Sequence, residues 1–250
     1  MDDPVLLTGA RGHVGTALLD YAGDAYDWRL LDRDPPADDR DYPGEFVVAD
    51  ITDEDAVRDA MQGCGAVVHL AGDPRKTAPW SSVLSNNIDG THTVLQAAVD
   101  EGVEKVAFAS SNHAVKHYET DRRPDLYRTH DDFLLDGTEL PRPGNLYGVS
   151  KAAGENLGRY YHDEHDLSFV AVRIGNLTEE HPPKDYERGQ AMWLSYRDCG
   201  HLFERCIEAD YEYEIVYGIS DNDRKYYSLE TAKRVLGYDP MDNSAHHIDE

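Results

Sequence analysis

Residues 5–15, Val5-Leu6-Leu7-Thr8-Gly9-Ala10-Arg11-Gly12-His13-Val14-Gly15, decide the fold of this 250-residue chain. A short apolar run, 5–8, breaks at Gly9, and apolar residues then recur at helical spacing from Val14 to Ala22. A glycine-rich turn between a strand and a helix offers free N–H groups and the positive end of the helix dipole to a pyrophosphate. We therefore predict a dinucleotide site at Gly9, Arg11, Gly12, His13, Val14 and Gly15.

Segments typical of strands and helices alternate along the rest of the chain. We expect further strands at 28–32, 45–50, 66–72, 103–111, 167–176 and 213–219. We expect helices at 80–101, 146–163 and 197–209, one opening at Ser228, and one that bears Ala56 to Met61 behind a capping box of Thr52 and Asp55. This alternation implies right-handed crossovers and a doubly wound parallel α/β sheet of the Rossmann type.

The domain organisation follows from the same alternation. We expect one Rossmann-type domain over residues 1–250, in which 1–175 mainly bind the cofactor and carry catalysis and 176–250 mainly bind the substrate. The irregular stretches 73–80, 113–145 and 176–192 each follow a strand. In an open α/β sheet such loops lie at the carboxyl edge, where ligands bind.

The charge of the chain is strongly acidic. It has 49 acidic and 24 basic residues, a formal net charge of −25, with 32 Asp, 17 Glu, 17 Arg and 7 Lys. High Asp with low Lys indicates a halophilic, archaeal type of protein whose carboxylates hold hydrated cations in concentrated KCl; the alternative is an ordinary acidic protein. Nucleic acid is not an expected partner, because binding it requires a basic face.

The chain also lacks the marks of a membrane or secreted protein. No apolar run approaches the roughly 20 residues of a membrane span, and the N-terminal stretch lacks the basic region of a signal peptide. Cys64, Cys199 and Cys206 form no metal or redox pattern and suit a reducing cytoplasm. We expect a cytoplasmic homo-oligomer with no metal. His113 and His117 are four residues apart, but no carboxylate or Cys completes a zinc set.

Acidic residues at two further strand ends indicate how a dinucleotide is held. Asp32 ends the second strand, 17 residues after Gly15, where a carboxylate accepts hydrogen bonds from ribose hydroxyls and repels a 2′-phosphate. This predicts NAD rather than NADP, although the neighbouring Arg33 could accept that phosphate. Asp50 ends the third strand and could meet the adenine edge or simply open the next helix.

Tyr147 and Lys151 form the pattern Y-x-x-x-K at the start of an expected helix. The i, i+4 spacing places both side chains on one helix face. A free tyrosine has a pKa of about 10 and is a poor base at neutral pH. An adjacent ammonium group favours the phenolate and lowers that pKa. The pair therefore predicts a tyrosine acid/base supported by a lysine.

The order of these motifs resembles the extended short-chain dehydrogenase/reductase family along the whole chain. The resemblance rests on 8–15, Asp50-Ile51, His69-Leu70-Ala71-Gly72, Asn87-Ile88-Asp89-Gly90-Thr91, Ser110-Ser111 and Tyr147 with Lys151. It implies that Ser111 positions the substrate oxygen, Tyr147 is the acid/base, Lys151 orients the nicotinamide ribose, and Asn87, or alternatively Asn86, supports a proton relay. It also implies cofactor contacts from Ile51, Leu70, Ala71, Gly72, Asn87, Tyr147, Lys151 and Ile174.

A narrower resemblance concerns sugar dehydrogenases. The runs 108–113, 172–176 and 188–193 look like those of uronate dehydrogenases; 72–75, 187–193 and 221–227 look closer to NAD-dependent glucose-6-phosphate dehydrogenases of haloarchaea. The first group implies that Ser111, Asn112 and His113 contact sugar hydroxyls, that Asn176 lies in the substrate site, and that Arg188 holds the C6 carboxylate. Arg75 and Lys76 depart from the uronate pattern, and two extra cations suit a phosphate. All three cations could instead be structural or exposed charges.

We therefore expect NAD-dependent oxidation of the anomeric C1 of a sugar to its lactone. In this scheme Tyr147 takes the hydroxyl proton while a hydride leaves C1 for the nicotinamide. Glucose 6-phosphate is favoured over a hexuronate. A nucleotide-sugar epimerase or dehydratase is less favoured, because about 74 residues after Asn176 (250 − 176 = 74) leave little material to hold a nucleotide diphosphate. A catalytically dead NAD-sensing regulator would not need Ser111, Tyr147 and Lys151 together.

Overall fold

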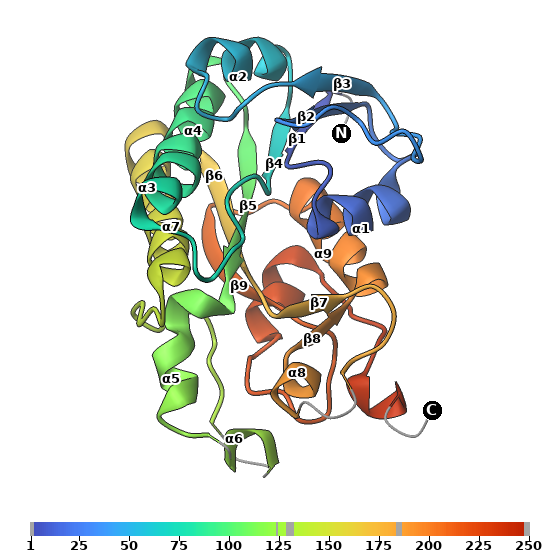
Figure 1. Cartoon of the computed structure of the whole chain (residues 1–250), viewed down its shortest axis with the longest axis vertical. Coiled ribbons are helices and arrows are strands. Elements are labelled where there is room, and N and C mark those ends of the chain that lie inside the picture. The colour runs from blue at the N-terminus through green and yellow to red at the C-terminus, as the bar shows by residue number, and fades with distance from the viewer. Residues whose placement is uncertain (1–2, 124, 129–132, 184–186, 248–250) are drawn as a thin grey trace.

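The computed structural model describes residues 3–123, 125–128, 133–183 and 187–247. Across these residues a seven-stranded, wholly parallel sheet runs in the order β3-β2-β1-β4-β5-β6-β9 (Figure 1). Its strands are β1 (Val5–Thr8), β2 (Trp28–Asp32), β3 (Glu45–Val48), β4 (Ala66–His69), β5 (Lys105–Ser111), β6 (Ser168–Ile174) and β9 (Tyr213–Gly218). The strand order changes direction between β1 and β4, which is where doubly wound sheets bind ligands. The predicted α/β fold is confirmed.

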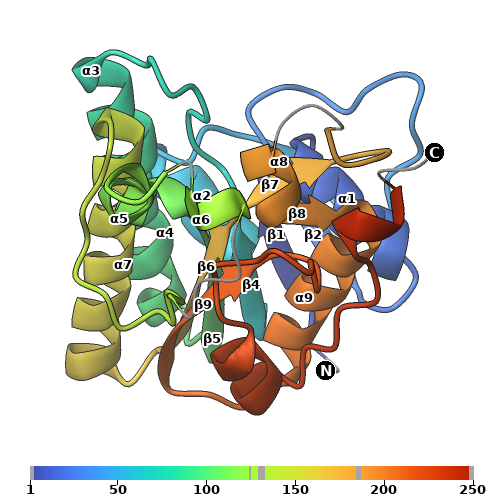
Figure 2. The same ribbon diagram turned by 90° about the horizontal axis from the view of Figure 1, so that it is seen from below.

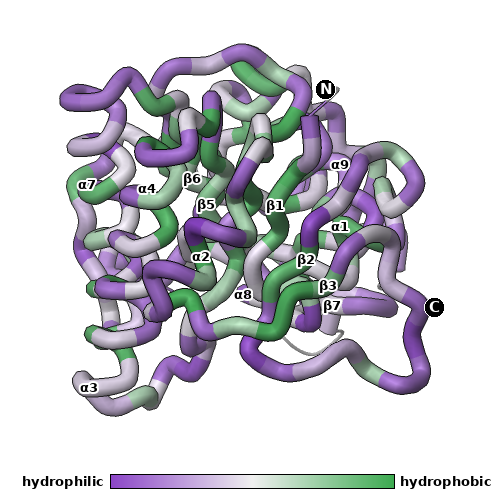
Figure 3. Tube along the Cα trace, turned by 90° about the horizontal axis from the view of Figure 1, so that it is seen from above, coloured by the Kyte–Doolittle hydropathy of each residue, from purple (hydrophilic) through white to green (hydrophobic). Residues whose placement is uncertain are grey.

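Helices cover both faces of the sheet (Figure 2). One face packs against α1 (His13–Ala22) and α9 (Tyr196–Glu208), and the other against α2 (Glu54–Met61), α4 (Gly90–Asp100) and α7 (Leu146–His165). Successive strand side chains point to opposite faces, so Val5 and Leu7 join the first core and Leu6 joins the second. Burial on both faces explains why the inner strands are rich in hydrophobic residues, which Figure 3 shows along β1.

Two helix starts differ from the sequence expectation. The capping box of Thr52 and Asp55 was wrong: Asp53 caps α2 by accepting the Ala56 N–H, while Thr52 donates its hydroxyl to Asp50. The short C-terminal helical segment expected to open at Ser228 contains η3 (Ala232–Leu236), a π-helical turn. Ser228 instead accepts the Glu230 N–H, as residues before a helix often do.

The expected helix at 80–101 is continuous but changes type. It consists of α3 (Trp80–Ser82), a π-helical segment η1 (Val83–Asp89) and α4. A π segment is uncommon and often marks a functional site. Here it carries Asn86 and Asn87, so the change in helical twist sets how these two side chains meet the sheet edge.

The irregular stretches contain short elements that the sequence periodicity did not reveal. They are η2 (Asn112–Val115), α5 (Lys116–Thr120), α6 (Asp125–Arg128), α8 (Glu187–Ala191), η4 (Ser244–His247) and a two-stranded parallel sheet of β7 (Asn176–Thr178) and β8 (Trp193–Ser195). Each is five residues or fewer, which is too short to show a period. Among the described residues, no helix combines the length and apolar character needed to cross a membrane.

The acidic charge lies almost entirely at the surface. Among the described residues, the buried carboxylates are Asp73, Glu119, Glu155 and Asp198, and each accepts hydrogen bonds. The remaining described carboxylates are exposed or half-buried, so their mutual repulsion depends on the salt in the solvent.

We predict that the fold depends on high salt. The range of electrostatic repulsion is about 10 Å at 0.1 M salt and about 3 Å at 1 M, so KCl should suppress the self-repulsion of a −25 chain. The midpoint of thermal unfolding, measured from 0.1 to 3 M KCl, should rise steeply. A midpoint that does not change over this range would contradict the halophilic interpretation.

Candidate active site

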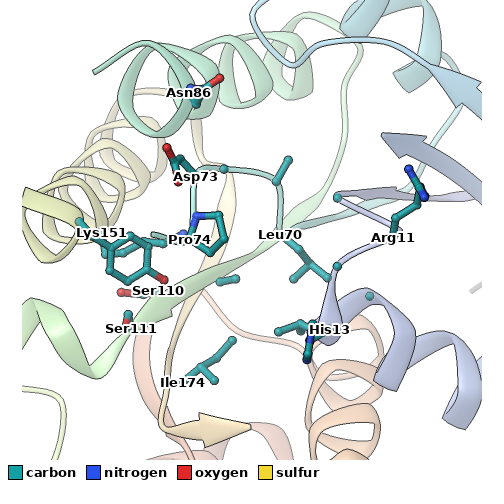
Figure 4. Close-up of a pocket in the computed structure, with 18 of the residues that line it drawn as sticks. Arg11, His13, Leu70, Asp73, Pro74, Asn86, Ser110, Ser111, Lys151 and Ile174 are labelled. Carbon is teal, nitrogen blue, oxygen red and sulfur yellow. The ribbon is translucent and has the colours of Figure 1, made fainter. Parts of the chain in front are cut away.

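A cleft of about 650 Å³ opens at the carboxyl ends of β1, β2, β4, β5 and β6. In Figure 4, Ser110, Ser111 and Lys151 lie on one side of it and Arg11 and His13 on the other, with Leu70 between them. The irregular stretches of the sequence contribute much of the lining, as expected for a doubly wound sheet.

The β1–α1 turn forms the floor at one end of the cleft. Gly9 has φ +74°, and a Cβ there would lie 2.8 Å from the Ala71 nitrogen, so only glycine lets this turn approach the end of β4. Gly12 precedes α1 and lines the cleft beside its first N–H groups. This is a cradle for a pyrophosphate, and the residues present fit a dinucleotide.

Most of the predicted cofactor residues line this cleft. They are Gly9, Arg11, Gly12, His13, Val14, Gly15, Asp32, Asp50, Ile51, Leu70, Ala71, Gly72, Tyr147, Lys151 and Ile174. Asn87 does not line it and is considered below. Asp50 also lines the cleft, although one of its oxygens accepts the N–H and the hydroxyl of Thr52.

The Asp32 carboxylate is oriented by backbone donors. It accepts the N–H of Arg11 at 3.0 Å and that of Asp34 at 3.2 Å. Arg33, which could accept a 2′-phosphate, also lines the cleft; it is largely exposed, and its Nε lies 3.9 Å from Asp34. The role of Asp32 in selecting NAD over NADP stays a prediction.

We predict that Asp32→Ala weakens binding of NAD and moves the preference toward NADP. Loss of hydrogen bonds to a charged group costs about 1.5–3 kcal/mol, which corresponds to an increase in KM for NAD of roughly ten- to a hundred-fold. KM and kcat for NAD and NADP in both proteins would check this. A wild-type enzyme that already prefers NADP would contradict the assignment of Asp32.

Ser111, Tyr147 and Lys151 meet on the opposite side of the cleft. Ser111 ends β5, and its hydroxyl accepts the His113 N–H at 3.2 Å and lies near enough to the Tyr147 phenol to lower its pKa. The Lys151 ammonium lies 5.6 Å from the centre of the Tyr147 ring and 4.9 Å from that of Phe108. Three of the four predicted catalytic side chains are therefore neighbours.

Burial has the largest effect on the pKa values of Tyr147 and Lys151. It raises the pKa of Tyr147, which the Ser111 hydrogen bond partly offsets, and it lowers the pKa of Lys151 to about 8, which Glu155 opposes. The predicted lowering of the Tyr147 pKa by Lys151 is therefore not found: burial raises this pKa, and Ser111 is the group that opposes the rise.

Asn87 and Asn86 have different places in the π segment. Asn87 accepts the Asp73 N–H at 2.6 Å, and its amide donates to the Asp73 carbonyl and to Ser150. It thereby fixes the loop after β4 from behind the cleft wall. Asn86 lines the cleft and donates to Ser82. The assignment of a proton relay to Asn87 stays a prediction, and Asn86 is the one placed to contact a ligand.

Two side chains after Ser111 present polar atoms that can bind a ligand. Burial, followed by the nearby cations, lowers the pKa of His113 to about 4, so its ring is neutral. The Asn145 side-chain oxygen accepts the Gly148 N–H, so its amide nitrogen donates to His113 Nδ1. The single ring proton of neutral His113 is therefore on Nε2, which can donate to a ligand. The Asn112 carbonyl oxygen, in a residue 2% exposed, has no hydrogen-bond partner among the described residues. His113 therefore offers one hydrogen-bond donor, and Asn112 offers one hydrogen-bond acceptor.

Three cations gather beyond His113. Lys76, Arg188 and Lys116 each lower its pKa through their positive charge, and Lys76 and Arg188 line the cleft. Arg188 donates its Nε to Glu119, which is 0% exposed and also accepts from Lys116, Tyr127 and Tyr226. Burial raises the pKa of Glu119, but the hydrogen bonds outweigh it and hold the pKa at about 2. This end of the cleft suits an anion.

Arg75 does not take the place expected of it. It does not line the cleft; its Nε and Nη2 bind the Asp73 carboxylate at 2.9 and 2.6 Å, and its side chain is 65% exposed. The carboxylate that binds it, Asp73, is two residues away in the chain. The sequence spacing alone did not reveal this ion pair. The other predicted substrate residues, Lys76, Ser111, Asn112, His113, Asn176 and Arg188, all line the cleft.

Several residues of the site were missed from the sequence. Asn145 could have been found as a helix N-cap before Leu146, and Lys116 and Glu119 as an i, i+3 pair. Among the described residues, no group of three His, Cys, Asp or Glu side chains is arranged to hold a metal ion. Cys64, Cys199 and Cys206 are free and buried.

Comparison with known proteins agrees with this geometry. Residues 5–196 match the model of the NAD dependent epimerase/dehydratase family. The chain is 73% identical over 250 residues to an NAD-dependent glucose-6-phosphate dehydrogenase of Haloferax volcanii, covering 98% of this chain and 95% of that protein. It is 34% identical to the uronate dehydrogenase of Pseudomonas putida, covering 96% of this chain and 84% of that protein.

The fold is also similar to solved structures. A mutant of uronate dehydrogenase from Agrobacterium tumefaciens, in complex with NAD, superposes with a TM-score of 0.81 at 30% identity, covering 98% of this chain and 88% of that one. A glucuronic acid dehydrogenase from Chromohalobacter salexigens gives a TM-score of 0.83 at 29% identity, covering 100% and 89%.

Proposed function

The chain belongs to the NAD dependent epimerase/dehydratase family, and from that premise we propose that it oxidises the anomeric C1 of glucose 6-phosphate to 6-phosphogluconolactone with NAD. The observation that carries the choice of substrate is the pair of cations, Lys76 and Arg188, that line the cleft beyond the Ser111–Tyr147–Lys151 centre. Lys116 adds a third positive charge nearby, and it shares the Glu119 carboxylate with Arg188. The 73% identity to the Haloferax volcanii enzyme supports the same choice.

The catalytic side chains divide the work of one proton transfer. Ser111 donates its hydroxyl hydrogen bond to the C1 oxygen and holds it beside the Tyr147 phenol. Tyr147, as phenolate, accepts the proton of the C1 hydroxyl. Lys151 would hold the nicotinamide ribose. NAD⁺, when bound, supplies the hydride-accepting ring and an additional positive charge.

The other residues of the cleft orient the sugar. His113 donates from Nε2 and the Asn112 oxygen accepts, so each can bind one hydroxyl of the pyranose. Arg188 and Lys76, supported by the charge of Lys116, bind the C6 phosphate. A carboxylate is satisfied by one Arg fork, whereas a phosphate dianion is better served by several cations.

We predict direct transfer of the C1 hydrogen. With glucose 6-phosphate carrying deuterium at C1, the reduced nicotinamide product should contain that deuterium, because the bond broken is C1–H. Mass spectrometry of the NADH formed in multi-molar KCl measures it, with deuterium at C2 as the control. Reduced product without the C1 deuterium would contradict oxidation at C1.

A uronate is the second candidate substrate. The similarity to uronate dehydrogenases at about 30% identity and the position of Arg188 at the far end of the cleft favour it. Lys76 argues against it, because it adds to Arg188 a second positive charge in the cleft that one carboxylate does not need. Turnover of glucuronate and galacturonate against glucose 6-phosphate separates the two.

We also propose the organisation of the protein in the cell. Residues 1–175 mainly serve cofactor binding and catalysis, and residues 176–250 mainly bind the substrate, although α5 adds Lys116 to the substrate side.

A homo-oligomer is supported by exposed apolar side chains on adjacent helical segments: Trp80 and Leu84 on α3 and η1, and Leu146 and Val149 on α7. A cytoplasmic location is supported by the three free cysteines. Light scattering in KCl tests the assembly.

A further inference from the structure

A buried carboxylate behind the catalytic centre joins three elements of the fold. Glu155 lies on α7, four residues after Lys151 and eight after Tyr147, and is 2% exposed. Its Oε1 accepts the Ser110 hydroxyl of β5 at 2.6 Å and Arg173 Nε of β6 at 2.9 Å, and its Oε2 accepts Arg173 Nη2 at 2.9 Å. Ser110 immediately precedes Ser111.

Close packing of α7 on the sheet makes this junction possible. A Cβ at Gly154 would lie 2.4 Å from the Phe108 ring, so only glycine lets the helix approach β5 this closely. The Lys151 ammonium rests over the same ring. Because residues i and i+4 share a helix face, Glu155 presents its charge to the side of α7 that carries Lys151.

We propose that Glu155 is a positioning residue, which fixes the strand end bearing Ser111 through Ser110 and keeps Lys151 charged from the same face of α7. The proposal rests on the catalytic roles given above to Ser111 and Lys151. A buried ion pair such as Glu155–Arg173 is weak evidence for stability, because desolvation offsets its attraction. Its contact with the catalytic strand is what gives it a functional meaning.

Among the described residues, few charged groups surround Lys151 and Glu155. Lys151 faces Phe108 of β5, Tyr147 and Glu155 of its own helix, and His69 of β4. Burial lowers the pKa of Lys151 to about 8, and among the described residues Glu155 is the carboxylate that opposes this. Glu155 faces Ser110 and Arg173, while the Tyr213 hydroxyl of β9 donates to its backbone carbonyl. Glu139 and Tyr217 contact Arg173 at 3.3 and 3.2 Å.

The test measures the proton affinity of Lys151 directly. The full-length protein in KCl is treated with trace acetic anhydride from pH 6 to 11, and acetylation of Lys151 is quantified by mass spectrometry. In wild type, Lys151 should titrate near pH 8. In Glu155→Gln its pKa should fall by about one unit, because the neighbouring negative charge is lost while the shape is kept. An unchanged Lys151 titration in the folded variant would overturn the electrostatic part of the proposal.

Two further variants keep the test decisive. Glu155→Gln leaves the Arg173 guanidinium underpaired, so the double variant Glu155→Gln/Arg173→Met is made beside it. Because the double variant also removes a positive charge, its Lys151 pKa should fall less than in Glu155→Gln. Ser110→Ala keeps the Glu155–Arg173 pair and should leave the Lys151 titration unchanged, while kcat falls about tenfold because Ser111 is held less firmly. Wild-type kcat in Ser110→Ala would overturn the positioning of Ser111.

The two readouts also separate this proposal from the proposed function. Labelling of Lys151 needs no substrate, so its result stands even if glucose 6-phosphate is not oxidised. Conversely, normal oxidation of glucose 6-phosphate with an unmoved Lys151 titration in Glu155→Gln would leave the function intact and remove the role of Glu155.

Discussion

Replacing Tyr147 with phenylalanine is expected to lower kcat for sugar oxidation by about two to four orders of magnitude, the range ascribed to a general acid–base group. The phenol contacts the Ser111 hydroxyl and lies beside Lys151 in the cleft, and the variant removes its single proton-accepting oxygen. The dinucleotide half of the cleft, built by Gly9, Gly12 and Asp32, is untouched. The dissociation constant for NAD, measured by fluorescence titration, should therefore change little.

The same helix offers a matched control. Tyr161 also lies on α7, is buried, and donates its hydroxyl to Gln96 rather than facing the cleft. Tyr161→Phe should keep wild-type turnover while making the same chemical change. Near wild-type rates in Tyr147→Phe, or an equal loss in Tyr161→Phe, would rule out Tyr147 as the specific base.

Replacing Arg188 with alanine should raise KM for glucose 6-phosphate by roughly a hundredfold. Arg188 lines the cleft and is oriented by the buried Glu119 carboxylate. A charge-assisted contact that is lost from a buried site costs about 2–3 kcal/mol. Because the phosphate is remote from C1, kcat/KM for glucose, which lacks the group, should change far less.

Neighbouring cations provide the comparison. Arg75→Ala removes a charge that is bound to Asp73 outside the cleft and should change KM by a factor of about two or less, as is typical of exposed pairs. Lys76→Ala should give an intermediate increase. If Arg188→Ala leaves the ratio of kcat/KM for glucose 6-phosphate to that for glucose unchanged, the placement of C6 is wrong. Thermal unfolding of each variant in KCl separates a binding defect from a folding defect.

The features that could be predicted from the sequence are those set by short local patterns. The turn at Gly9–Gly15, Asp32 at a strand end, and Tyr147 with Lys151 on one helix face need only the neighbouring residues to be placed. The parallel, doubly wound sheet was predicted from the alternation of strands and helices. All the predicted cofactor residues except Asn87 line the cleft.

The substrate side depends on contacts between distant segments. Arg75 forms an ion pair with Asp73, and Arg188 donates a hydrogen bond to Glu119, which is 69 residues away in the chain. The π-helical segment η1, in which Asn86 lines the cleft and Asn87 does not, also carries no periodic signal in the sequence. These features are decided by packing between short elements, for which local propensity gives little guidance.

The most direct measurement is the set of kcat/KM values for NADH formation in multi-molar KCl with glucose 6-phosphate, glucuronate, galacturonate and glucose. The arrangement of Tyr147 and of the two cations that line the cleft, Lys76 and Arg188, predicts that glucose 6-phosphate has the highest value, with glucose turned over poorly. A higher kcat/KM for glucuronate or galacturonate would contradict the phosphate assignment, and no NADH formation with any of the four would contradict oxidation of these sugars at C1.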